Sequence, residues 1–237
     1  MDQKELNWAK GSKILIILAH PDDPEFFMGG TIAAWTAAGH QVQYGLLTNG
    51  ERGVSPAFPD SKKLAEVRFT EQKNAAAKLG VHQIDYFGYP DGYLVGSIEM
   101  RKVLAGFIRK VKPDILVSSD PNMLFSRGRY LNHPDHRAAG QIVIDSLFPA
   151  VGNPSFFPEL LDEGLMPWQV KEFWLTLTNE PDLLLDVDAY WQQRYEALCE
   201  HRSQIGDPKA LLERLNSRRN SLEEPYREGF KRIVFGG

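Results

Sequence analysis

The chain has 237 residues, of which 43% are hydrophobic, and this is enough to bury a large core within a single domain. Its formal net charge of −4, without any run of Lys and Arg, excludes the basic surface that a nucleic-acid partner requires. Because the N-terminus is polar and the longest apolar run is only Ile14–Ala19, we expect a cytoplasmic protein without a signal peptide or a membrane partner.

The first part of the chain alternates between apolar runs and helical patterns. Lys13–His20 is a continuous, β-branched apolar run, which is typical of a strand buried on both faces of a parallel sheet. Gly29–Gly39 predicts a helix that stops at a glycine, and Gln41–Thr48 predicts the next strand. Ser61–Leu79 opens with a serine suited to cap a helix and carries apolar residues at helical spacing, and a short strand, Gln83–Phe87, follows it.

The alternation continues to about residue 147. Ile98–Val111 predicts an amphipathic helix and Pro113–Ser118 a buried strand, after which we expect a long loop, Asp120–Asn132, and a helix over Ala138–Leu147. This order favours an α/β fold with a Rossmann-like, mostly parallel sheet that is flanked by helices and joined by right-handed crossovers. Ligands of such a fold bind at the carboxyl ends of the strands.

The pattern changes in the C-terminal part, where prolines interrupt the chain. We predict a strand over Val170–Thr178 and helices over Ala189–Cys199 and Pro208–Arg218. Aromatic residues near the start of this part offer apolar surface either for a homo-oligomer or for covering the core: Phe148, Phe156, Phe157 and Trp168.

We expect all of these elements to form one domain over residues 1–237. Its core would lie at about 12–147, and a smaller C-terminal subdomain would follow at about 148–237. A second domain is not expected, because no flexible linker separates the two parts.

A cluster of ionisable residues follows the first predicted strand, in the sequence AHPDDPEF. His20, Asp22, Asp23 and Glu25 lie within six residues at the place where this fold class binds its ligand. A histidine that ends a strand and a turn-forming Asp–Pro pair would explain the cluster without any function.

A second cluster favours the functional interpretation. In NHPDHRAAG, the residues His133, Asp135 and His136 also follow a buried strand, so the two clusters should converge in space. Imidazole and carboxylate groups bind first-row metals, and three protein ligands with a fourth position for water characterise a catalytic zinc site. A structural zinc site is not expected, because Cys199 is the single cysteine.

The paired motifs AHPDD and HPDH resemble those of the LmbE/PIG-L family of zinc-dependent deacetylases, which act on N-acetylglucosaminyl compounds. Four further segments also look like this family: TNGERG at 48–53, Glu66–Arg68 with Glu71, YPDGYL at 89–94 and HRSQ at 201–204. The resemblance therefore covers nearly the whole chain. It implies that His20, Asp23 and His136 bind one zinc ion per chain, with another divalent metal as the alternative.

The resemblance also implies a mechanism for a small-molecule substrate that contains an N-acetylated amino sugar. Asp22 becomes the general base that takes a proton from a zinc-activated water, which attacks the amide carbonyl. A protonated His133 would face the resulting oxyanion, while Asp135 would raise the His133 pKa and orient its ring. The departing amine receives its proton from either Asp22 or His133.

Two more residues are candidate substrate contacts. By resemblance, Arg68 holds a sugar hydroxyl and Asp91 lies in a loop near the site, and both groups suit directional hydrogen bonds to hydroxyls. The other interpretation is that Arg68 only pairs with Glu66, Glu71 or Asp91.

Three features depart from the family pattern or stand apart from it. Some members have a tyrosine two residues before the HPDH histidine, whereas this chain has Leu131 there and Tyr130 one position earlier, so the role of that tyrosine is not carried over. Pro24 displaces Glu25, which we expect to support a ligand residue rather than to bind the metal. His201, within HRSQ, is a histidine that could reach the site.

Three other functions must be weighed against deacetylation. A nucleotide-binding module is disfavoured, because the first loop offers carboxylates where a phosphate needs amide donors. A metal-dependent phosphoesterase usually pairs two metal ions, and a metal-binding protein without catalysis does not need Asp22. Among deacetylase substrates, a thiol precursor, a chitin-derived disaccharide and an antibiotic intermediate stay open, whereas a lipid-linked sugar is disfavoured.

Overall fold

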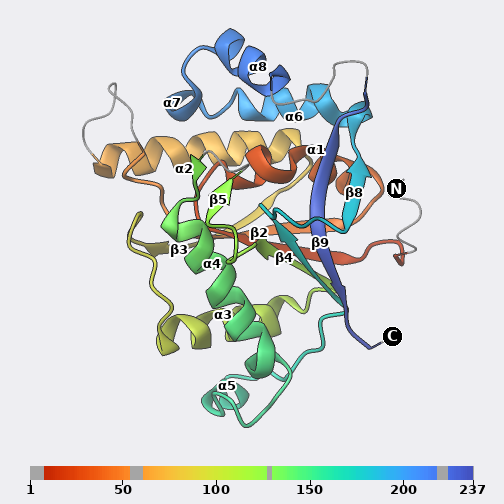
Figure 1. Cartoon of the computed structure of the whole chain (residues 1–237). Coiled ribbons are helices and arrows are strands. Elements are labelled where there is room, and N and C mark those ends of the chain that lie inside the picture. The colour runs from red at the N-terminus through yellow and green to blue at the C-terminus, as the bar shows by residue number, and fades with distance from the viewer. Residues whose placement is uncertain (1–7, 54–60, 127–129, 218–223, 237) are drawn as a thin grey trace.

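The computed structural model describes residues 8–53, 61–126, 130–217 and 224–236. Seven strands in these residues form one sheet: β1 (Lys13–Leu18), β2 (Gln41–Thr48), β3 (Gln83–Tyr89), β4 (Ile115–Ser119), β7 (Glu172–Thr176), β8 (Leu183–Asp186) and β9 (Arg227–Val234). Their order is β3-β2-β1-β4-β7-β9-β8 (Figure 1). The first five strands of this order are parallel, and β9 is antiparallel to both of its neighbours.

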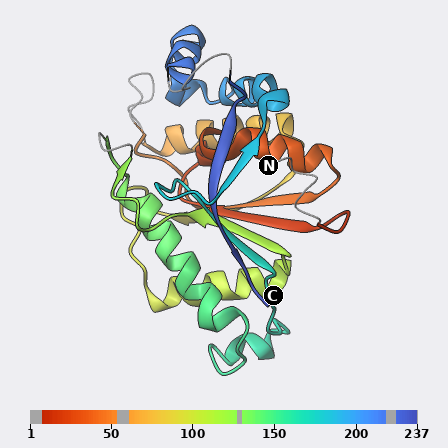
Figure 2. The same ribbon diagram turned by 45° about the vertical axis from the view of Figure 1, so that its right-hand side comes forward.

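Helices cover both faces of the sheet. The longer helices are α1 (Asp23–Ala37), α2 (Ser61–Lys78), α3 (Ile98–Val111), α4 (Pro134–Asp145), α6 (Trp191–Leu198) and α8 (Pro208–Asn216). The shorter ones are the π-helical η2 (Ser146–Val151), α5 (Glu159–Asp162), the 3₁₀ helix η3 (Asp188–Tyr190) and α7 (Arg202–Ile205). α1 and α2 lie on one face with α6 and α8 beyond them, and α3 and α4 lie on the other, as the rotated view also shows (Figure 2). The predicted α/β fold is confirmed.

β1 explains why this sheet needs helices on both sides. Ile14, Ile16 and Leu18 face the core beneath α1 and α2, whereas Leu15 and Ile17 face the core above α3 and α4. All five side chains are at most 1% exposed. Each such burial stabilises the fold by about 1.5–3 kcal/mol, so the uninterrupted apolar run commits β1 to the centre of the sheet.

The order of the strands creates a topological switch point between β1 and β4. From β1 the chain moves outward through β2 to β3, and it then returns to place β4 on the opposite side of β1. Ligands of open α/β sheets bind at such a point, outside the carboxyl ends of the strands. α1 begins shortly after β1, and α4 lies in the connection that follows β4.

The two helices at the switch point begin earlier than the sequence patterns predicted. α1 starts at Asp23 rather than Gly29, and α4 starts at Pro134 rather than Ala138. In both helices a proline occupies the first or second helical position, where its missing N–H has no intrahelical partner to lose. Both motifs predicted to bind the metal therefore lie at helix N-termini.

The structure also corrects the prediction after β4. The expected loop Asp120–Asn132 contains a two-stranded hairpin, β5 (Phe125–Ser126) with β6 (Tyr130–Leu131). The strands β8 and β9 were missed, and they extend the main sheet beyond β7. The last predicted helix forms α8, although its predicted end, Arg218, lies outside the described residues.

None of the helices in the part of the chain that the structure describes has the length and apolar character needed to span a bilayer. Of the aromatic residues noted there, Phe157 and Trp168 pack against the core next to α3 and α4, whereas Phe148 is largely exposed.

Candidate metal centre

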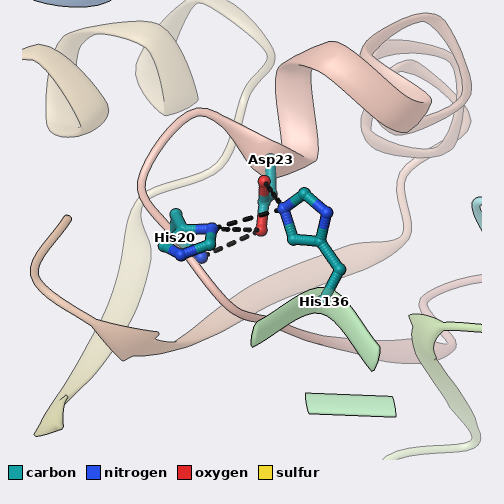
Figure 3. Close-up of side chains that lie close together, drawn as sticks. All are labelled: His20, Asp23 and His136. Atoms are coloured by element: carbon teal, nitrogen blue, oxygen red, sulfur yellow. Dashed lines mark hydrogen bonds and ion pairs between the residues drawn. The ribbon is translucent and has the colours of Figure 1, made fainter. Parts of the chain in front are cut away.

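Three predicted metal ligands meet at the switch point. His20 follows β1, Asp23 is the first residue of α1, and His136 lies in the first turn of α4 (Figure 3). His136 Nε2 is 3.1 Å from Asp23 Oδ1 and 3.3 Å from His20 Nδ1, and His20 Nδ1 is 3.5 Å from Asp23 Oδ2. Two imidazole nitrogens and a carboxylate that converge in this way fit a divalent metal ion with an open coordination position.

The opposite nitrogen of His20 is held by two carboxylates. Its Nε2 lies 3.1 Å from Asp91 Oδ1 and 3.3 Å from Asp135 Oδ2. A hydrogen on Nε2 satisfies these acceptors and leaves the lone pair on Nδ1, which faces the other ligands. Burial opposes a positive charge here, but hydrogen bonds that the imidazole donates to these carboxylates and to Asp23 raise the His20 pKa well above its usual value. The same negative charges favour a bound metal cation.

His136 is oriented by a residue that the sequence analysis missed. Its Nδ1 lies 2.9 Å from Oδ1 of Asn132, so Nδ1 carries the hydrogen and Nε2 is free to bind a metal. Asn132 is itself fixed, because its backbone N–H and its side-chain Nδ2 donate to the carbonyls of Leu124 and Met123 at 2.9 Å each. Asn132 directly precedes the HPDH motif, but its amide is uncharged and is not itself a metal ligand, so the sequence analysis passed over it.

A second set of candidate ligand atoms lies beside the first. His20, His133 and Asp135 also bring metal-binding atoms within 4.8 Å of one another. The Asp135 carboxylate, however, already accepts backbone N–H bonds from Gly92 at 2.6 Å and Leu94 at 3.1 Å. We therefore take His20, Asp23 and His136 as the better metal centre.

Asp22 lies between this centre and helix α2. Its carboxylate pairs with Arg68 at 3.1 Å, and burial of the carboxyl raises its pKa although the Arg68 charge opposes the rise. Arg68 also donates to the backbone carbonyls of Gly50 and Pro21. Its ion-pair partner is thus Asp22, which was not among the partners anticipated for it, and only 4% of its side chain is exposed.

His133 and Asp135 do not interact as expected. The Nδ1 atom of His133 accepts the backbone N–H of Asp135 at 3.2 Å, which caps α4, and the Asp135 carboxylate serves His20 and the backbone of the 92–94 segment instead. Partial burial and the nearby His20 and His136 lower the His133 pKa. The negative charge of Asp135 raises the His133 pKa, as predicted, but burial and the two other histidines outweigh it, so the net shift is downward. The Asp135 carboxylate bonds to His20 and to the 92–94 backbone rather than to the His133 ring.

The Asp91 side chain, predicted as a substrate contact, bonds to other parts of the protein in this structure. Its side chain is 7% exposed, and its carboxylate faces His20 Nε2 and accepts the backbone N–H of Arg52 at 3.0 Å. The residue thus orients a candidate metal ligand, His20, and anchors the backbone at Arg52. Nearby on β6, Tyr130 and Leu131 are exposed.

His201 reaches toward the site from the C-terminal part, but it contacts Glu25 rather than the ligand atoms. The His201 Nε2 atom is 3.2 Å from Glu25 Oε2, and both side chains are fully buried. Despite burial, the hydrogen bond with Glu25 raises the pKa of His201.

Comparisons with known proteins agree with this geometry. The sequence model of the family described as PIG-L, GlcNAc-PI de-N-acetylase, matches residues 15–147. A diacetylchitobiose deacetylase of Thermococcus kodakarensis is 34% identical over 214 residues, which cover 90% of this chain and 74% of that protein. A probable N-acetyl-alpha-D-glucosaminyl L-malate deacetylase 2 of Bacillus anthracis is 29% identical, with 85% of each chain covered.

A solved structure shares the whole architecture. The N,N'-diacetylchitobiose deacetylase of Pyrococcus horikoshii matches with a TM-score of 0.84 and 31% identity, over 94% of this chain and 84% of that one. The family and the activity class predicted from the motifs are thus confirmed. The chain belongs to the PIG-L family of de-N-acetylases, and it is a hydrolase of N-acetyl groups.

Proposed function

We propose that this protein is a zinc-dependent enzyme that removes the acetyl group from an N-acetylated amino sugar within a small molecule. The observation that carries the proposal is the convergence of His20, Asp23 and His136, with the Asp22 carboxylate held by Arg68 beside them. Two imidazoles and one carboxylate are ligands that zinc accepts, and another divalent metal is the alternative. When bound, such an ion acts as a Lewis acid and lowers the pKa of water to about 7.

Asp22 is the proposed general base. Its side chain is 15% exposed, so it stays accessible to solvent while it pairs with Arg68. A carboxylate in this position accepts the proton of the attacking water and then delivers it to the departing amine. Arg68 holds this base in place, and it has few donors left for a sugar hydroxyl because it already bonds Gly50 and Pro21.

His133 is proposed to hold the carbonyl oxygen of the substrate. Because its Nδ1 accepts the N–H of Asp135, the neutral ring carries its hydrogen on Nε2. That N–H can donate to the developing oxyanion without a charged imidazole. Asp135 contributes by fixing His133 through its backbone and His20 through its carboxylate.

The substrate class follows from the relatives, whose names describe deacetylases of diacetylchitobiose and of an N-acetylglucosaminyl malate. The decisive experiment incubates the protein with N-acetylglucosamine, diacetylchitobiose and N-acetylglucosaminyl conjugates of malate and inositol, and measures both primary amine and acetate. We expect equal amounts of the two products, loss of activity with a chelator, and recovery when zinc is added back.

The same assay separates the other functions. Phosphate release from sugar phosphates without amine release would favour a phosphoesterase. Tight zinc binding without release of either product would favour a metal-binding protein that lacks catalysis.

A further inference from the structure

The backbone of Asp22 adopts a conformation that side chains rarely take. Its φ is 87° and its ψ is −27°, in the left-handed region that favours glycine. Such a conformation costs free energy and persists only where surrounding contacts hold it. The contacts that hold Asp22 therefore bear on how its carboxylate is aimed.

Helix α2 supplies these contacts from two residues one turn apart. Gln72 Oε1 accepts the backbone N–H of Asp22 at 2.6 Å, and Arg68 pairs with the Asp22 carboxylate at 3.1 Å. Residues four apart on a helix lie on one face, so α2 holds the peptide and the carboxylate of Asp22 together. Gln72 is fully buried.

The orientation of the Gln72 amide is dictated by its two neighbours. Its Nε2 donates to both oxygens of Glu25, at 3.0 and 3.1 Å. An ionised carboxylate only accepts hydrogen bonds and a backbone N–H only donates, so the amide oxygen must face Asp22. Reversal of the amide would lose all three bonds.

Glu25 is fixed in turn by two other segments of the chain. The hydroxyl of Tyr44, a residue of β2, donates to Glu25 Oε1 at 3.4 Å, and His201 Nε2 lies 3.2 Å from Glu25 Oε2. A buried carboxylate with these partners is a rigid anchor for the amide of Gln72. The chain of contacts from His201 through Glu25 and Gln72 thus ends on the backbone of Asp22.

We propose that Gln72 is a positioning residue that aims the general base Asp22, with Glu25 and His201 holding its amide in the required orientation. This inference rests on the proposed function, in which Asp22 accepts the proton of the attacking water. No hydrogen bond within the described residues joins Gln72 to His20, Asp23 or His136, so it acts on the base and not on the metal ligands.

The test is the variant Gln72→Met, which keeps the size of the side chain and removes its acceptor. Misplacement of a reacting group by about 1 Å can cost roughly 100-fold in rate, so we expect kcat to fall about 10- to 100-fold. KM and the affinity for zinc should stay within about threefold of wild type, since neither depends on the aim of the base. The matched control is Gln141→Met, an exposed glutamine on α4, which should leave kcat unchanged.

A reciprocal exchange gives the rescue. In the double variant Glu25→Gln with Gln72→Glu, the carboxylate at position 72 can accept the Asp22 N–H. The amide at position 25 can donate to that carboxylate, so both contacts of Gln72 are restored with the roles of the two side chains exchanged. The kcat of this double variant should be at least tenfold higher than that of Gln72→Met. If Gln72→Met does not fold, Gln72→Asn replaces it, because the shorter amide cannot span Asp22 and Glu25 together.

A readout that does not need turnover is the hydrogen exchange of the Asp22 amide, measured by NMR in the zinc-loaded protein. We expect faster exchange in Gln72→Met than in wild type. The inference would be overturned if Gln72→Met kept wild-type kcat, lost zinc affinity in parallel with kcat, or showed unchanged hydrogen exchange of the Asp22 amide. It would also be overturned if the double variant had no higher kcat than Gln72→Met. A wild-type protein without chelator-sensitive amine release would instead overturn the proposed function.

Discussion

The Nδ1 atom of His136 and the Oδ1 atom of Asn132 lie 2.9 Å apart, which assigns the hydrogen of this ring to Nδ1. The lone pair on Nε2 then faces Asp23 and His20. The outer hydrogen bond of a metal-binding histidine fixes both its tautomer and its direction.

Asn132→Ala should therefore weaken zinc binding without removing any ligand. Loss of such an outer partner typically lowers metal affinity by roughly 10- to 100-fold. The measurement is competition against a chelator of known zinc affinity. Asn153→Ala, which changes a partly buried asparagine elsewhere, is the control, and equal affinities in the two variants would contradict the role of Asn132.

Asp22→Asn should separate metal binding from catalysis. Asparagine tolerates the left-handed backbone and keeps the shape of the side chain, but it cannot accept a proton. We expect stoichiometric zinc and a fall in kcat of about 10²- to 10⁴-fold. His136→Ala should instead lose the metal itself. A fully active Asp22→Asn protein would refute the assignment of the base.

Gly50→Ala should disturb the base through Arg68. Gly50 has a φ of +63°, and an added Cβ would overlap the guanidinium of Arg68. We expect a lower unfolding temperature, a stability loss of about 1–3 kcal/mol and a reduced kcat, because Arg68 must move away from Asp22. Gly164→Ala, at a φ of +76° with open space around it, controls for backbone strain alone. Equal kcat in both variants would contradict the contact.

Glu172 gives a pH dependence of stability that is separate from the metal. Arg232 donates to both of its carboxylate oxygens at 2.8 Å, and although burial opposes it, hydrogen bonds from Arg232 and Trp174 lower the pKa of Glu172. A lowered pKa means that the contribution is fully present above the unfolded pKa of about 4.3 and is lost as the pH falls through the folded value.

Glu172→Gln should therefore be less stable than wild type by about 1–3 kcal/mol at pH 7, and by much less at low pH. Urea unfolding at pH 7 and about pH 3, both with chelator present, measures this difference without a contribution from metal loss. A difference that is the same at both pH values would show that the charge of Glu172 does not matter.

The elements that could be predicted from sequence are those with strong local signals. β2 and α3 have the predicted bounds, because an apolar run and an amphipathic pattern each end at clear stops. β9 was missed because its sequence, REGFKRIV, is charged and pairs with strands distant in the chain. The start of α1 was misplaced although Pro24 in its first turn is a helix-start signal.

The residues of the site also differ in how far the sequence could predict them. The convergence of His20, Asp23 and His136 was predictable, because both clusters follow buried strands whose carboxyl ends meet at one edge of the sheet. Their assignment as metal ligands rests on the resemblance to the family and stays a prediction. Asn132 and Gln72 are neutral amides whose roles depend on distances of 2.9 Å and 2.6 Å across the fold, and no local pattern encodes these distances.

The candidate ligands come from two segments that are far apart in the chain, so the ribosome completes them at different times. His20 and His136 are 116 residues apart, so at about 5–20 residues per second the third ligand is made roughly 6–23 s after the first. During that interval the nascent chain holds two ligands and no complete centre. The proposed metal can therefore be held by all three residues only once α4 has been translated, and β7, β8 and β9 are translated after that point.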